Sequence, residues 1–120
     1  MAEDLYNVPY VMTRQEIAEQ EIAVLGGSVT ILEGCLRECR KAAIRNSIKQ
    51  PVAGLMFKAT KMIREIDADT AWKFGCHLCN RLNWIQDHQH PWTAEHAIPF
   101  LEHLIQDFRG GYFEALLKRG

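Results

Sequence analysis

The fold is decided by residues 13–43, TRQEIAEQEIAVLGGSVTILEGCLRECRKAA. Apolar side chains recur in this stretch with steps that alternate between four and three residues, which is the 3.5-residue period of a coiled-coil-like seam. The seam consists of Ala18, Ile22, Leu25, Val29, Leu32, Leu36, Cys39 and Ala43. Thr13 and Glu16 have the spacing of a capping box, in which the threonine oxygen accepts a hydrogen bond from the glutamate amide. We therefore expect one long helix that begins at Thr13.

Two adjacent glycines, Gly26 and Gly27, interrupt this stretch without shifting the phase of the seam. Each glycine costs a helix about 1 kcal/mol relative to alanine, yet the unbroken phase favours a single helix. The alternative is a break at the glycines and a second helix, because Thr30 and Glu33 have the spacing of another capping box.

A second apolar row runs along the same helix at seven-residue intervals and consists of Ile17, Val24 and Ile31. Together with the seam, this row widens the apolar surface beyond one narrow stripe, so the helix should be covered on more than one side. In a single small domain, this pattern predicts a homodimer.

The following segments continue the helical period, and no alternation is long enough for a convincing strand. Pro51 suits the first turn of a second helix, where its missing amide hydrogen would have no partner, and this helix reaches about Glu65. Asp67 or Asp69 can cap a third helix, which should end before Pro91.

The last third of the chain contains several residues that commonly end helices. After a polar loop over residues 86–91, Thr93 can cap a further helix. Pro99 either kinks this helix or begins a new one that runs to Gly110–Gly111. A short helix over 112–118 would then close the chain. These segments predict an all-α fold of about five helices.

Length and composition agree with a single helical domain. The chain has 120 residues, of which 48% are hydrophobic and 24% charged, with a net charge of −1. We expect an extended arm over residues 1–12 and one compact domain over 13–120. No stretch approaches the roughly 20 apolar residues of a membrane span, and the first residues lack the features of a secretory signal. We therefore expect a soluble, cytoplasmic protein that does not bind membranes.

Charge is segregated along the chain. Residues 1–33 contain six acids and one base, whereas residues 34–64 contain eight bases and one acid. Within the long helix this order complements the helix dipole, and it also favours antiparallel pairing of two copies. The alternative is a nucleic-acid-binding regulator whose basic patch contacts phosphates. That patch would consist of Arg37, Arg40, Lys41, Arg45, Lys49, Lys58 and Lys61.

The four cysteines form two closely spaced pairs, Cys35 with Cys39 and Cys76 with Cys79. Four thiolates suit tetrahedral zinc, so a small zinc-stabilised helical module is a second alternative. Both pairs fall inside predicted helices, however, whereas structural zinc pairs usually lie on turns. We therefore expect free thiols and no cofactor.

The sequence contains no serine elbow, phosphate loop or paired carboxylates of a catalytic site, so we do not expect an enzyme. In its size, its all-helical pattern and its long helix suited to self-association, the chain resembles the small bacterial quorum-sensing anti-activators that sequester LuxR-type transcription factors. This resemblance implies a steric mechanism, in which the protein covers the regulator's ligand-binding or dimerisation surface and so prevents DNA binding.

Binding of another protein through apolar helical contacts is therefore the expected function. The expected contacts to a partner or a second subunit are apolar residues of the arm and of the second apolar row: Leu5, Tyr6, Val8, Tyr10, Val11, Ile17, Val24 and Ile31. The alternative is that these side chains belong to the core of the chain itself.

Overall fold

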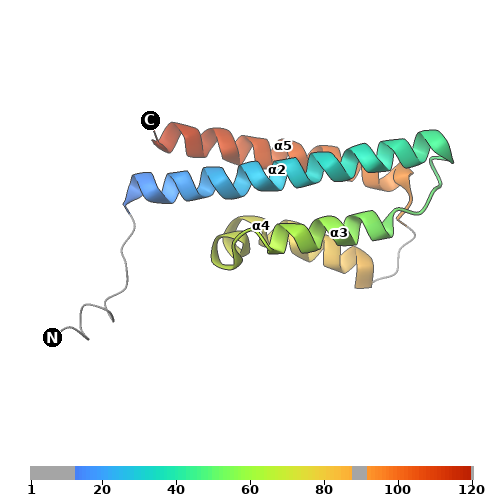
Figure 1. Ribbon diagram of the computed structural model, residues 1–120, viewed down its shortest axis with the longest axis horizontal. Coiled ribbons are helices and arrows are strands. Elements are labelled where there is room, and N and C mark those ends of the chain that lie inside the picture. Colours follow the sequence, from blue (N-terminus) through green and yellow to red (C-terminus); the bar gives the residue numbers. More distant parts are fainter. Residues whose placement is uncertain (1–12, 88–91, 120) are drawn as a thin grey trace.

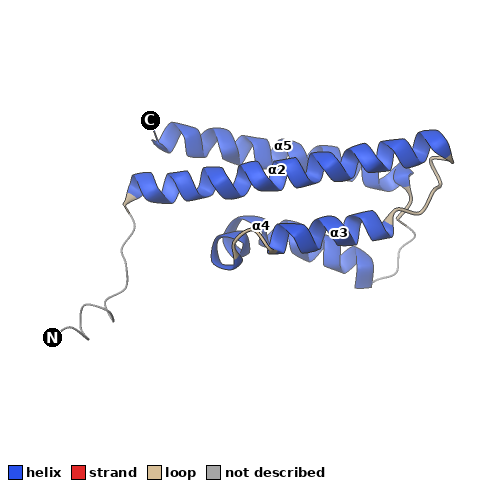
Figure 2. Cartoon of the chain, in the orientation of Figure 1, coloured by secondary structure: helices blue, strands red, loops and turns tan. Residues whose placement is uncertain are grey.

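The computed structural model describes residues 13–87 and 92–119, and this part of the chain is all-α. It contains four helices: α2 (Arg14–Arg45), α3 (Ala53–Arg64), α4 (Ala68–Asp87) and α5 (Ala94–Arg119). Figure 2 shows the loop between α2 and α3 and the turn between α3 and α4. The expected arm over residues 1–12 lies outside the described residues. In this structure none of the described helices is long and apolar enough to cross a membrane.

Helix α2 begins where the capping box predicts. The Thr13 side chain accepts a hydrogen bond from the Glu16 amide at 3.1 Å. The helix then continues for 32 residues through Gly26 and Gly27, so the expectation of one unbroken helix is confirmed.

Helix α5 is longer than the sequence indicates. It continues through Pro99 and through Gly110–Gly111, so the prediction of a separate last helix over 112–118 is wrong. The described residues form four helices instead of about five. The reason is packing against α2. A Cβ atom at Gly111 would lie 3.4 Å from the Leu25 side chain, and one at Gly26 would lie 3.7 Å from Tyr112. The glycines thus let the two helices approach closely, and this contact offsets their low helix propensity.

The start of α3 also differs from the prediction. Pro51 lies ahead of the helix, whose N-cap is Val52. Residues beside the proline pair with the segment before α5: the Val52 amide donates to the Trp92 carbonyl at 2.6 Å, and the Ala94 amide donates to the Gln50 carbonyl at 2.9 Å. These two backbone hydrogen bonds hold the N-terminal ends of α3 and α5 side by side.

The helices form two antiparallel pairs. Helices α2 and α5 lie along each other over most of their length, and the hairpin of α3 and α4 packs against them (Figure 1). All four helices contribute to one apolar core. Its largest, almost fully buried side chains are Leu32, Met56, Ile63, Leu78 and Leu101.

Ion pairs connect α2 to α5 in antiparallel register. In the first third of α2, Glu21 pairs with Lys118 at 3.8 Å, and past its middle Glu33 pairs with Arg109. Near its end, Arg40 pairs with Glu102 at 3.6 Å. Just beyond α2, Lys49 pairs with Glu95.

The acidic half of α2 therefore lies beside the basic end of α5, and its basic half beside the acidic start of α5. The charge segregation that we associated with a second copy is satisfied within one chain. The homodimer itself stays a prediction.

Candidate functional site

The second apolar row of α2 has mixed surroundings. Val24 is only 3% exposed, so it belongs to the interior of the chain. The prediction that Val24 contacts a partner or a second subunit is therefore wrong. The reason is the α3–α4 turn, which contacts α2 on both sides of Val24. Gln20 donates to Asp67 at 2.7 Å, and a Cβ atom at Gly27 would lie 3.3 Å from Ile66.

The other two residues of the row remain accessible. Ile17 lies one turn beyond this contact and is 45% exposed, and Ile31 is half-buried. The arm residues of the expected interface lie outside the described part of the chain: Leu5, Tyr6, Val8, Tyr10 and Val11. The structure therefore leaves Ile17 and Ile31 as the accessible members of the row.

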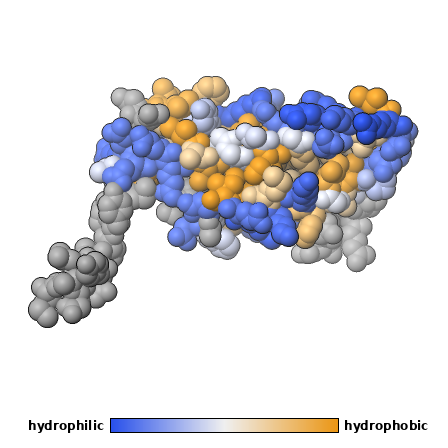
Figure 3. Space-filling view, viewed as in Figure 1, coloured by the Kyte–Doolittle hydropathy of each residue, from blue (hydrophilic) through white to orange (hydrophobic). Residues whose placement is uncertain are grey.

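Ile31 opens onto a surface groove between α2 and α3, which we call the α2–α3 groove. It has a volume of about 310 Å³ and is lined by Thr30, Ile31, Gly34, Cys35, Arg37, Glu38, Leu55, Lys58, Ala59 and Met62. Figure 3 shows apolar residues gathered where α2 and α3 meet, with polar residues on both sides.

The floor of the α2–α3 groove is formed by buried residues of both helices. Cys35 and Ala59 are buried there. The Cys35 thiol donates to the Leu55 carbonyl at 3.5 Å and lies 3.9 Å from the sulfur of Met56, which joins α3 to α2. Above this floor, Met62 is 42% exposed. On the opposite wall, Gly34 has no atom within 4 Å of the place where a Cβ would lie. The groove is therefore apolar and open at Gly34.

The rim of the α2–α3 groove is predominantly positive. Arg37 and Lys58 are exposed and form no ion pair with any residue that the structure describes. The one acid on the rim, Glu38, lies 3.4 Å from Lys41. An anionic group in this groove would thus find two cations that pair with no described acid, and Glu38 as the one carboxylate of the rim.

All seven residues of the predicted basic patch are exposed, but they do not act as one positive surface. Arg40, Lys41 and Lys49 each pair with a glutamate. Ion pairs to described residues are absent for the remaining four, which are Arg37, Arg45, Lys58 and Lys61. Two of these four are the cations of the groove rim.

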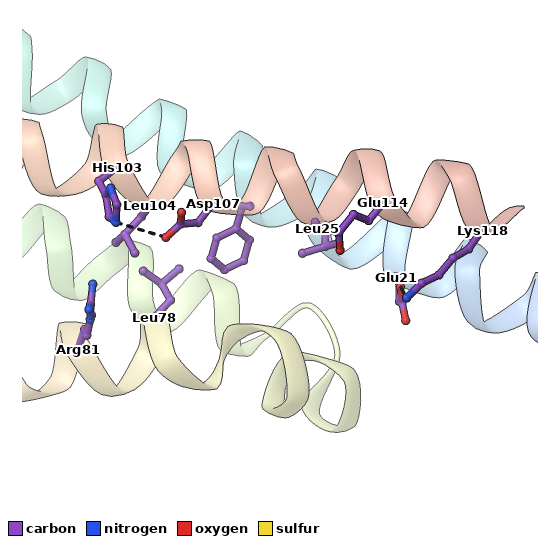
Figure 4. Close-up of a pocket in the computed structure, with 11 residues that line it drawn as sticks. Glu21, Leu25, Leu78, Arg81, His103, Leu104, Asp107, Glu114 and Lys118 are labelled. Atoms are coloured by element: carbon purple, nitrogen blue, oxygen red, sulfur yellow. Dashed lines mark ion pairs between the residues drawn. The ribbon is translucent and has the colours of Figure 1, made fainter.

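A second hollow, of about 470 Å³, lies between α4 and the α2–α5 pair (Figure 4). Leu25, Leu78 and Phe108 are among the residues that line it. Its lining intersperses acids with bases: Glu21 pairs with Lys118 at 3.8 Å, His103 lies 3.5 Å from Asp107, and Arg81 and Glu114 also line the hollow. No group of cations without a nearby acid lines this hollow, unlike the rim of the α2–α3 groove.

The cysteine pairs lie on different helices, Cys35 and Cys39 on α2 and Cys76 and Cys79 on α4. Among the described residues, no three or more His, Cys, Asp or Glu side chains gather into a group that could hold a metal ion. The four-cysteine zinc site is therefore not assembled in this structure.

The hydrogen bond between Cys35 and Cys39 has opposite effects on the two thiols. It raises the pKa of Cys35, as burial also does, and it lowers the pKa of Cys39. In α4, burial raises the pKa of Cys79. The buried thiols of Cys35 and Cys79 are therefore held in the protonated form.

No role was predicted for Gly34 from the sequence. The available signal was the heptad that runs from Gly27 to Gly34, which places both glycines on the side of α2 that carries Ile31. No family model, curated protein or solved structure matches this chain. The geometry of the α2–α3 groove is therefore the basis for assigning a function.

Proposed function

We propose that this chain is a non-enzymatic regulatory protein that binds and inhibits a partner protein. The occupant of the α2–α3 groove would be an amphipathic helix of the partner, apolar on one face and acidic at its margins. The observation that carries this proposal is the combination of an apolar lining with two cations, Arg37 and Lys58, that pair with no described acid.

The physical basis is the usual one for a helix in a groove. Apolar anchors at positions i, i+3, i+4 and i+7 of the partner would cover Ile31, Leu55 and Met62. Burial of this surface supplies the affinity, while the contacts of acidic side chains with Arg37 and Lys58 select partners by charge. Two or three buried anchors would dominate the binding energy.

Inhibition would be steric. A helix held between α2 and α3 is no longer available for the partner's own assembly or for its ligand. A transcription factor is the partner class implied by the resemblance to anti-activators, and the chain would then prevent it from binding DNA.

Two glycine substitutions test this proposal with a matched control. Gly34 lies in the wall of the α2–α3 groove, and Gly110 lies on the exposed face of α5. Neither has an atom within 4 Å of a Cβ position, so the first atom of a leucine side chain meets no neighbour at either, and helix propensity rises equally. Only Gly34→Leu would fill the groove.

The probe is a fluorescein-labelled amphipathic peptide with leucines on one face and glutamates on the other, measured by anisotropy. We expect binding to the wild type, at least about tenfold weaker binding to Gly34→Leu, and unchanged binding to Gly110→Leu. The same peptide with lysines in place of glutamates should bind more weakly. Equal binding of the glutamate peptide to both leucine variants would contradict the proposal.

The four cations without ion pairs to described residues keep a nucleic-acid-binding regulator as the second candidate. This candidate predicts that labelled duplex DNA binds and that its affinity falls steeply between low and moderate salt, because phosphate contacts release counterions. Apolar binding of the peptide is far less sensitive to salt. The comparison at two salt concentrations therefore separates the two functions.

A further inference from the structure

We propose that Cys76 and Cys79 of α4 form a binding site for a soft monovalent cation, Cu(I), held between their two sulfur atoms. This inference goes beyond the proposed function, because the site shares no residue with the α2–α3 groove and requires no partner protein. It rests on a hollow that both cysteines line, on their spacing along α4 and on the polar group beside each sulfur.

Cys76 and Cys79 line one surface hollow, which lies between α4 and the end of α3 and has a volume of about 320 Å³. Cys79 is 8% exposed, whereas Cys76 is half-buried and the neighbouring Trp72 is 71% exposed. None of the other lining residues is acidic: Arg64, Ala71, Trp72 and Asn80. The hollow therefore gives a small cation access to two thiols and to no carboxylate that would hold it by charge alone.

The spacing of the two cysteines favours a metal bridge over a disulfide. Both lie inside the regular helix α4, three residues apart. Residues at this spacing have Cβ atoms about 5–6 Å apart, whereas a disulfide needs about 3.5–4.5 Å between its Cβ atoms. A cation with thiolate bonds as long as those of zinc, about 2.3 Å, on opposite sides separates the two sulfurs by about 4.6 Å. A bridging ion therefore fits the undistorted helix, and a sulfur–sulfur bond does not.

Each sulfur lies beside a hydrogen-bond donor. The Asn80 side-chain nitrogen Nδ2 donates to Sγ of Cys76 at 3.4 Å. Burial raises the pKa of Cys79, and the positive charge of Arg64 and a hydrogen bond from it act in the opposite direction. Arg64 forms no ion pair with an acid that the structure describes. Its charge is therefore available to offset the negative charge that remains when two thiolates hold one Cu(I).

The number of ligands selects Cu(I) over zinc. No group of three or more His, Cys, Asp or Glu side chains that could hold a metal ion occurs among the described residues, so tetrahedral zinc would lack half of its four ligands. Cu(I) is a soft ion that prefers thiolates and accepts two of them in a line. On its uptake two S–H bonds break, two Cu–S bonds form and two protons pass to the solvent, with no change of oxidation state.

Competition with the Cu(I) chelator bathocuproine disulfonate, under nitrogen and with ascorbate as the reductant, tests the site in the full chain. We expect the wild type to take up one equivalent of Cu(I) from the chelator, and Cys76→Ser and Cys79→Ala each to lose it. Cys35→Ala with Cys39→Ala is the control, because it removes the other, buried thiol pair and should keep the equivalent. Far-UV circular dichroism verifies that every variant is folded.

A second pair of variants tests the contribution of the neighbouring cation. Arg64→Met should weaken Cu(I) binding at least about tenfold, because the charge and the hydrogen bond beside Cys79 are lost. Lys61→Met removes an equal charge from α3 outside the lining of the hollow and should leave the affinity unchanged. One equivalent of Cu(I) should also slow the alkylation of Cys76 by iodoacetamide at least about tenfold, because a coordinated thiolate is not free to react.

Equal uptake of Cu(I) by the wild type and by a folded Cys76→Ser variant would overturn the proposal. Loss of the equivalent in the control variant at Cys35 and Cys39 would also overturn it, because the ion would then bind the thiol pair of α2. An unchanged rate of alkylation at Cys76 in the presence of Cu(I) would have the same consequence. These readouts involve no peptide or partner protein, so failure here is distinguishable from failure of the proposed function.

Discussion

At the scale of single residues, the four thiols differ in access more than in chemistry. Cys35, Cys39 and Cys79 are buried, whereas Cys76 is half-exposed. The lowered pKa of Cys39 favours its thiolate, but this side chain is fully buried. Reaction with iodoacetamide needs both a thiolate and access, so the burial of Cys39 outweighs its lowered pKa.

We therefore expect Cys76 to be alkylated at least about tenfold faster than the three buried thiols in the folded protein near pH 7.5. Peptide mapping after timed alkylation measures this order. Cys76→Ser should abolish the fast reaction and leave the slow ones unchanged. Rapid labelling of Cys35 in the folded wild type would contradict the closed groove floor.

Glycines are the residues for which the sequence was least informative. Gly26 and Gly111 allow α2 and α5 to approach, and Gly34 opens the α2–α3 groove, yet a glycine adds no apolar side chain to the periodic pattern from which buried faces are predicted. Apolar positions were more predictable, because Leu32 and Leu36 repeat with the helical period. The core could thus be predicted, whereas the wall of the groove could not.

At the scale of helices, the predicted bounds match the structure where neighbouring residues in the sequence determine them. The start and continuity of α2 followed from Thr13, Glu16 and an unbroken phase. The extent of α5 could not be predicted, because Pro99 and Gly110–Gly111 read as stops unless the packing partner is known. Tertiary contacts with α2 override these local preferences, as they commonly do.

The pair between Lys49 and Glu95 joins the loop after α2 to the first turn of α5 and predicts a pH dependence. A hydrogen bond and the positive charge of Lys49 lower the pKa of Glu95 below its ordinary value of 4.5. A carboxylate with a lowered folded pKa stabilises the fold above its unfolded value, and this contribution is lost as the pH falls through the folded value.

Lys49→Met should therefore lower the melting temperature near neutral pH, and its difference from the wild type should shrink as the pH falls below 4.5. Thermal melts followed by circular dichroism between about pH 7 and about pH 3 measure this difference. Lys61→Met removes an equal charge that has no acid partner among the described residues and should show no such trend. A difference that persists unchanged at the lowest pH would contradict the role of Glu95.

At the scale of the whole molecule, contacts within one chain account for charge and apolar patterns that a pair of chains could also explain. The antiparallel charge order of α2 matches either α5 or a second copy, and the second apolar row is covered at Val24 by the chain's own α3–α4 turn. Sequence periodicity reports that a face is buried and does not report which chain buries it. The all-α class was therefore predictable, whereas the partner of each face required the structure.

Because side chains from all four helices share one core, we expect the chain to unfold as a single cooperative unit. Far-UV circular dichroism follows all helices, whereas tryptophan fluorescence reports on Trp72 and Trp84 in α4 and on Trp92 before α5. Both signals should share one urea midpoint. Leu101→Ala, at a fully buried core position, should lower the free energy of unfolding by about 2–5 kcal/mol and shift both midpoints together.

Ile44→Ala, at an exposed position of α2, is the control and should change the free energy of unfolding by less than about 0.5 kcal/mol. The alternative is a core that divides between the α2–α5 pair and the α3–α4 hairpin. In that case the fluorescence would change at lower urea than the circular dichroism, because the hairpin would unfold while α2 and α5 stay paired. Coincident transitions in the wild type and in Leu101→Ala would instead show that the hairpin, and with it the α2–α3 groove, exists only as long as the whole domain is folded.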